Sequence, residues 1–243
     1  MFNKLLIVGD SFCRNRDKQS DWPVYLGKLL GSEVHGRGRG GCSWWSSRND
    51  LNDYKLDRSS TILIVVHTES IRLPNDHNYP VNAGVLKSVP GTPADDLKDK
   101  GAGIRQLAID FYTSELFSLS FCTWAQQAWI AELDSQNDFF ATVHVPAFTS
   151  VNLSRVKNGI VMTPGGKFAS LRDVSEAEVG DITWSGADSR SNHLKDFNNV
   201  KFAEAIADTV KNLSPGAAGH YTFKNMSEWD LTPVKFTRPN QNK

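Results

Sequence analysis

A serine near the N-terminus and a histidine before the last amphipathic segment are the residues best suited to nucleophilic chemistry. Ser11 ends a Gly-Asp-Ser sequence that follows the apolar run 4–8, and His193 precedes the segment 194–213. A serine hydroxyl that loses its proton to a histidine can attack a carbonyl carbon. Asp188, five residues before His193, is a carboxylate that could orient the imidazole. Each residue also has an ordinary explanation, because serine often caps turns and a histidine before a helix is usually solvated.

A glycine-rich loop offers a second place for ligand contact. Residues 36–41 alternate glycine with arginine, so the backbone could approach a ligand closely and direct its N–H groups. Gly38 and Gly41 are the candidates for such donors. The loop matches neither the P-loop sequence nor the dinucleotide-binding pattern, and a flexible turn explains it equally well. A phosphate- or nucleotide-binding domain that uses Arg37 and Arg39 is a third hypothesis for the chain, behind the two given below.

Polar side chains follow the most apolar run of the chain, and two tryptophans follow the glycine-rich loop. Glu69 and Arg72 lie just after residues 61–66 and either line a site or form a structural ion pair with each other. Trp44 and Trp45 could stack on a sugar ring, while packing in the core or in an interface is an equally good explanation. These residues join the candidate site as substrate-binding positions.

Strands and helices alternate along the chain, which predicts a three-layer α/β/α domain with a mainly parallel sheet. Asp21 is expected to cap the first helix and Gly31 to end it, and Phe197 is expected on the buried face of the last helix. The predicted strands cover 4–8, 33–35, 61–66, 139–145 and 159–162, and the predicted helices cover 22–30, much of 104–136, and 194–213. Ligands of such sheets bind beyond the carboxyl ends of the strands. The loops that carry the candidate residues should therefore meet there.

Together these features resemble the SGNH/GDSL hydrolase family over about residues 5–213. The resemblance implies a flavodoxin-like sheet and an esterase that removes acetyl or other acyl groups, often from carbohydrates or lipids. It places Ser11 at the nucleophile and His193 at the general base. It also places Gly41, which Gly38 precedes, at the glycine whose N–H stabilises the oxyanion.

Two positions depart from the family's pattern. Glu69 stands where the family has an asparagine that donates to the oxyanion, and an ionised carboxylate cannot donate a hydrogen bond. Arg190 stands three residues before His193, at the family's acid, and Asp188 is the nearest replacement. This form is similar to SGNH-like proteins of tailed phages. Two hypotheses stay open: a serine esterase acting on a carbohydrate ester, and a catalytically degenerate binding or structural component, for example of a phage virion.

The chain is expected to form one domain with two additions. Residues 1–213 would form the SGNH hydrolase-like domain, within which 74–103 are rich in Pro, Gly, Asn and Asp and predict an excursion or lid. Residues 214–243 form an aromatic tail that should pack on the domain or on a protein partner. Specificity for a substrate or partner is expected to reside in these two segments.

The composition argues against several classes of protein. The 243 residues include 27 Lys+Arg and 27 Asp+Glu, and a zero net charge argues against binding nucleic acid or an anionic membrane. The longest apolar run is too short to cross a bilayer. Three scattered cysteines fit neither a disulfide framework nor a zinc module, so no metal and no cofactor are expected. The N-terminus lacks the features of a signal peptide, which predicts a cytoplasmic or virion-associated protein.

Overall fold

The computed structural model describes residues 2–14, 21–36, 38, 42–70, 119–136, 138–179 and 190–234, which contain a six-stranded sheet. The strands are β1 (Lys4–Gly9), β2 (Glu33–His35), β3 (Thr61–His67), β4 (Ala141–Pro146), β5 (Ile160–Thr163) and β6 (Gly219–Thr222). Their order is β2-β1-β3-β4-β5-β6, and every neighbouring pair is parallel. All carboxyl ends therefore lie at one edge of the sheet, where ligands bind in open α/β folds.

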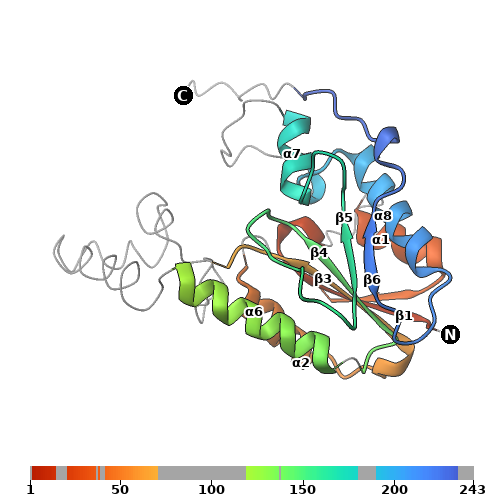
Figure 1. Ribbon diagram of the computed structural model, residues 1–243. Helices are drawn as coiled ribbons and strands as arrows, with labels where there is room; N and C mark the ends of the chain where they lie inside the picture. The colour runs from red at the N-terminus through yellow and green to blue at the C-terminus, as the bar shows by residue number, and fades with distance from the viewer. Residues whose placement is uncertain are drawn as a thin grey trace, which may run out of the picture.

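Helices cover both faces of this sheet (Figure 1). The described α-helices are α1 (Trp22–Leu30), α2 (Trp44–Asp53), α6 (Leu119–Gln136), α7 (Leu171–Val179) and α8 (Asp196–Val210), and the short 3-10 helices include η1 (Ser11–Cys13) and η4 (Ser191–His193). Helices α1 and α8 pack against one face, and α2 and α6 against the other. This arrangement confirms the predicted α/β/α class and the flavodoxin-like fold that the family resemblance implied.

Successive residues of β1 face opposite layers. Leu5 and Ile7 belong to the core cluster shared with α1 and α8, whereas Leu6 and Val8 belong to a second cluster shared with α2 and α6. A strand buried on both faces needs an uninterrupted apolar run, which is the pattern that revealed this strand in the sequence. The same holds for β3, whose seven residues are all buried.

The predicted strands are confirmed within two residues, and α1 ends at Gly31 in the left-handed conformation (φ 61°). Asp21 is the N-cap residue of α1, as predicted, although its side chain makes no capping hydrogen bond. The prediction for Phe197 is wrong, since its side chain is 50% exposed. Asn198 and Asn199 take the buried face of the first turn of α8 instead. Of the helix predicted within 104–136, α6 covers the part from residue 119, and the remainder lies outside the described residues.

Helices α2 and α7 were not among the predicted elements. The first is polar in sequence, and its buried start is fixed by Ser43, whose Oγ accepts the Ser46 N–H at 3.3 Å. The start of α7 is a capping box. Ser170 Oγ accepts the Asp173 N–H at 3.3 Å, and Asp173 Oδ2 accepts the Ser170 N–H at 2.9 Å. These capping sequences are the signals that would have located both helices.

The chain after α8 adds the sixth strand, β6, in parallel register with β5. Beyond it, the rings of Phe223 and Trp229 stack on each other at 5.9 Å, and both contact Phe202 of α8. Residues 219–229 of the aromatic segment thus lie against β5 and α8 of the same chain. The predicted excursion 74–103 lies outside the described residues.

Candidate active site

Ser11 lies in a tight turn directly after β1, at the carboxyl edge of the sheet. The strand ends at Gly9, whose φ of 150° is a conformation that residues with a side chain rarely adopt, and a Cβ there would lie 2.5 Å from the Val66 carbonyl oxygen. The carboxylate of Asp10 then accepts the Phe12 N–H at 3.0 Å and fixes the start of η1. The backbone of Gly9 and the cap from Asp10 therefore set the local shape of the turn that carries the serine hydroxyl.

The turn is also tied to the helical layer behind it. The indole N–H of Trp22, in α1, donates to the Phe12 carbonyl at 2.6 Å. Trp22 is fully buried, and its ring packs edge-on against Phe202 of α8 at 4.8 Å. Through this contact the serine turn is held against the same helix that follows the candidate histidine.

His193 lies next to this turn, and its Nε2 is 2.7 Å from Ser11 Oγ. The two residues are 182 positions apart in the sequence, and the parallel sheet brings their loops together. The imidazole also packs against the Phe12 ring at 5.1 Å. This distance is that of a strong hydrogen bond between a hydroxyl and an imidazole, the geometry that a general base needs.

The backbone around His193 is strained. Asn192 has a φ of 55° and His193 a φ of 57°, which is the left-handed region for two consecutive residues other than glycine. Such a conformation costs about 1–3 kcal/mol per residue and persists only where the surrounding structure enforces it. The candidate base is therefore held by contacts from outside its own segment.

Arg190, at the position of the family's acid, is part of a buried ion pair. Its guanidinium lies 2.6 Å from the Glu178 carboxylate of α7, and the two side chains are 7% and 0% exposed. Burial raises the pKa of Glu178, while the hydrogen bond from Asn198 and the charge of Arg190 oppose that shift. Sequence reasoning did not find Glu178, because it lies in a helix that was not predicted.

Glu69, at the position of the family's asparagine, forms an ion pair with Arg172 of α7 at 3.1 Å. The same guanidinium contacts Glu176 at 2.7 Å and lies over the Phe148 ring at 5.4 Å. The expected alternative pairing with Arg72 involves a residue outside the described part of the chain. Part of the negative charge at this position is thus balanced by a cation from another element.

Of the remaining predicted site residues, one lies at the serine turn, one packs between helices, and three lie outside the described residues. Gly38 is buried against the serine turn, and a Cβ there would lie 2.4 Å from both the Asp10 carbonyl oxygen and the Cys13 carbonyl carbon. Trp44 begins α2 and stacks on Trp129 at 6.1 Å, so its ring packs between helices. Gly41, Asp188 and Arg72 lie outside the described residues.

His67 and His144 form a buried pair between β3 and β4. Their rings are stacked with an interplanar angle of 5°, and His67 Nε2 lies 2.9 Å from His144 Nδ1. Burial lowers the pKa of His144 from 6.5 to about 4, and burial together with His144 lowers the pKa of His67 well below its usual value. Both rings are therefore neutral at pH 7, and they pack against each other in the interior of the protein.

The thiols near the serine turn are buried. Cys13 Sγ donates to the Asp10 carbonyl at 3.4 Å, and Cys42 Sγ donates to the Gly9 carbonyl at 3.0 Å. Burial, with the nearby charge of Asp10, raises the pKa of Cys13, which disfavours the reactive thiolate. Within the described ranges, no group of three or more His, Cys, Asp or Glu residues could hold a metal ion. No helix in the described part of the chain is long and apolar enough to cross a membrane.

The fold and the site define a three-layer α/β protein with a serine–histidine pair at the carboxyl edge of its sheet. No protein-family model and no curated protein matches the chain. A search of solved structures gives a protein described as a candidate lipolytic protein of the G-D-S-L family, from Desulfitobacterium hafniense DCB-2. It is 16% identical, with a TM-score of 0.29, over 61% of this chain and 63% of that protein, which is less than two thirds of its length.

Proposed function

We propose that this protein is a serine hydrolase that cleaves ester bonds, with Ser11 as nucleophile and His193 as general base. The observation that carries the proposal is the 2.7 Å separation of His193 Nε2 and Ser11 Oγ at the sheet edge where α/β enzymes bind substrates. The turn that holds Ser11 is built on a buried strand, so the hydroxyl is presented in a fixed place. A fixed nucleophile within reach of a base is the common requirement of covalent acyl transfer.

The proposed reaction has two halves. His193 Nε2 takes the Ser11 hydroxyl proton as Oγ bonds to the ester carbonyl carbon, and the carbonyl oxygen becomes an oxyanion. Collapse of this intermediate breaks the bond to the alcohol oxygen, which receives the proton from His193, and leaves an acyl-serine. Water then loses a proton to His193 and attacks the acyl carbon, which releases the carboxylic acid and returns the proton to Ser11.

The oxyanion would be stabilised by backbone N–H groups, for which we propose Ser11 and Gly41. Gly38 supports this assignment, because this residue lies against the backbone of Asp10, Cys13 and Arg14 in the turn that carries Ser11. We further propose Asp188 as the acid that orients the imidazole. The substrate class that the family resemblance favours is an acetyl or other acyl ester of a carbohydrate, and a chain with no net charge suits a neutral sugar.

Labelling and hydrolysis test this function directly. A fluorophosphonate probe should label the wild-type protein at Ser11, and the protein should hydrolyse p-nitrophenyl acetate and release acetate from acetylated oligosaccharides. Ser11→Ala should lose both activities while its circular dichroism spectrum is unchanged. Undiminished hydrolysis by Ser11→Ala would refute the mechanism. Hydrolysis of p-nitrophenyl acetate without release of acetate from the oligosaccharides would refute only the substrate class.

A second candidate function is a binding or structural component without catalysis, for example in a phage virion. Glu69 favours it, since a carboxylate at the oxyanion position would repel the developing negative charge. The ion pair with Arg172 reduces that repulsion, which is why we prefer the esterase. Absence of fluorophosphonate labelling at Ser11 in a correctly folded protein would reverse this preference.

A further inference from the structure

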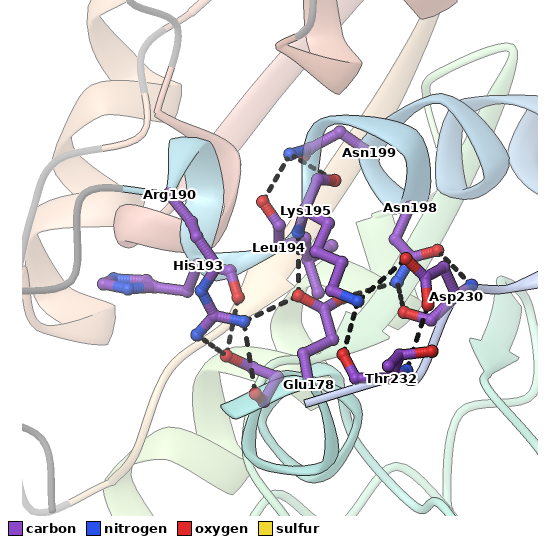
Figure 2. Close-up of polar contacts among 10 residues, drawn as sticks. Glu178, Arg190, His193, Leu194, Lys195, Asn198, Asn199, Asp230 and Thr232 are labelled. Carbon is purple, nitrogen blue, oxygen red and sulfur yellow. Dashed lines mark hydrogen bonds and ion pairs between the residues drawn. The ribbon is translucent and has the colours of Figure 1, made fainter. Parts of the chain in front are cut away.

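The segment that carries His193 is fastened to α7 at three points, and Figure 2 shows these contacts. Before the histidine, the Arg190 guanidinium donates to the Ser175 carbonyl at 3.2 Å and to Ser175 Oγ at 2.9 Å. At the histidine, Ser175 Oγ donates to the His193 carbonyl at 2.6 Å. After it, the Lys195 N–H donates to Glu178 Oε2 at 2.7 Å. Ser175 and Glu178, one turn of α7 apart, thus hold both sides of the strained residue.

Glu178 is the centre of this arrangement. One carboxylate oxygen accepts from Arg190 at 2.6 Å and from the Lys195 N–H, and the other accepts from Asn198 Nδ2 at 2.7 Å. The side chain is fully buried, so its charge needs these partners. We call Ser175, Glu178 and Arg190, with their contacts to residues 193–198, the Glu178 network.

A second layer supports the network from the C-terminal side. Asn198 Nδ2 donates to the Asp230 carbonyl at 2.8 Å, and Asn198 Oδ1 accepts the Asp230 N–H at 2.8 Å. The Lys195 ammonium forms an ion pair with Asp230 at 2.8 Å. The segment after β6 therefore closes the network, and three separate parts of the chain converge on the residues around His193.

The network acts on the backbone of His193, and its carboxylate does not serve as the acid of a triad. The imidazole points away from Glu178 (Figure 2), toward Ser11. The oxygens of Glu178 are bonded to Arg190, Lys195 and Asn198. Arg190, which stands at the position of the family's acid, instead binds Ser175 and Glu178 of α7.

We propose that Arg190 and Glu178 are positioning residues, which hold His193 in its left-handed conformation and so keep its imidazole within hydrogen-bond distance of Ser11. This inference rests on the proposed serine hydrolase function for its catalytic consequence, while the placement of His193 can be measured without catalysis. Removing the network should move the imidazole away from the nucleophile and leave the rest of the sheet intact.

The kinetic experiment compares four variants with the wild type on p-nitrophenyl acetate. Arg190→Met should lower kcat by about 10- to 100-fold with little change in KM, because small displacements of a reacting group cost that much. Ser175→Ala removes the hydrogen bonds that Ser175 Oγ makes with the His193 carbonyl and with Arg190 but keeps the Arg190–Glu178 ion pair, so it should lower kcat less. The double variant Glu178→Gln/Arg190→Met removes both charges of this buried ion pair, so its thermal stability should exceed that of Arg190→Met while its kcat stays low. Arg48→Met is the matched control, since it removes an ion pair to Glu132 outside the site and should leave kcat unchanged.

An NMR experiment separates positioning from catalysis. In ¹³C-histidine-labelled protein at one pH, Ser11→Ala should change the ring chemical shifts of His193 in the wild-type background and leave them unchanged in the Arg190→Met background. If Ser11→Ala changes these shifts equally in both backgrounds, or if folded Arg190→Met and Ser175→Ala keep wild-type kcat, the positioning role is overturned. Absence of hydrolysis by the wild type would instead refute the proposed function, and the NMR comparison would still decide the role of the network.

Discussion

The two halves of the candidate site are held in place by different means. Ser11 is positioned by neighbours in sequence: the end of β1, the left-handed Gly9 and the cap from Asp10 all lie within two residues of it. His193 is positioned by residues of α7 and, behind them, by Asp230. The turn of the nucleophile thus takes its shape from local backbone geometry, with Trp22 and Gly38 packed against it, whereas the base depends on a buried network assembled from distant segments.

This difference indicates where the site can tolerate change. A turn that follows a buried strand keeps most of its shape as long as the sheet is folded, since its glycine and its cap adjoin the strand itself. The strained segment around His193 depends on side chains from distant parts of the chain. Loss of one of them would leave a buried charge unpaired, which costs stability. We therefore expect substitutions away from the reacting atoms to lower kcat more when they affect the segment that carries His193 than when they affect the turn that carries Ser11.

The largest effect is expected where the two halves act as one unit. His193→Gln should lower kcat on p-nitrophenyl acetate by about 10³-fold or more, and Ser11→Ala should do the same. The double variant should be no slower than either single variant, because a nucleophile and its base contribute jointly. Single-turnover kinetics would measure this. Additive losses in the double variant would show that the two residues act independently.

The sheet beneath Ser11 should add its own pH dependence of stability. The neutral form of His144 is favoured in the fold, so the unfolded chain binds more protons as the pH falls from 6.5 toward about 4. Stability from this residue is complete above pH 6.5 and is lost over that interval, by on the order of 3 kcal/mol. Urea unfolding at pH 7, 5.5 and 4.5 would measure the slope.

His144→Phe is the variant that isolates this contribution. It should be less stable than the wild type at pH 7, because His67 Nε2 loses its partner, yet show a shallower dependence of unfolding free energy on pH. If unfolding free energy depends on pH as steeply in His144→Phe as in the wild type, the pH dependence comes from groups other than His144.

Close backbone packing on the serine side predicts sensitivity to a single methyl group. Gly38→Ala would place a Cβ 2.4 Å from the Asp10 carbonyl oxygen, so we expect a loss of about 1–3 kcal/mol in stability and of about tenfold in kcat. Gly31→Ala is the control: it is strained by its φ of 61° but has open space around it, so kcat should stay unchanged. Equal kcat in both variants would mean that the glycine-rich loop does not support Ser11.

The smallest expected effect concerns Glu69, which lies between the two halves in sequence and pairs with α7. Glu69→Asn would replace a carboxylate with an amide that can donate, so kcat should rise by up to about tenfold. Glu69→Ala, which removes the charge without adding a donor, should raise kcat less. A decrease in both variants would show that the ion pair with Arg172 matters more to the site than the repulsion of the oxyanion.

The sequence alone determined those features whose causes are local. Apolar runs gave the buried strands, because a strand covered on both faces must be apolar throughout. Gly31 gave the end of α1, because a left-handed residue there needs no side chain. Ser11 and His193 were identifiable as candidates from their places relative to a strand and a helix. Helices α2 and α7 were missed, although the capping box at Ser170 and Asp173 was present in the sequence.

Only the tertiary structure decided which distant residues meet. The partner of Arg190 is Glu178, the partner of Glu69 is Arg172, and His67 stacks on His144. Each pairing depends on sheet order and on which helix covers which loop, and no spacing in the chain encodes it. The physical reason is that a strand or a turn is stabilised by its own neighbours, whereas a buried charge or a strained histidine is stabilised by whatever the fold brings next to it.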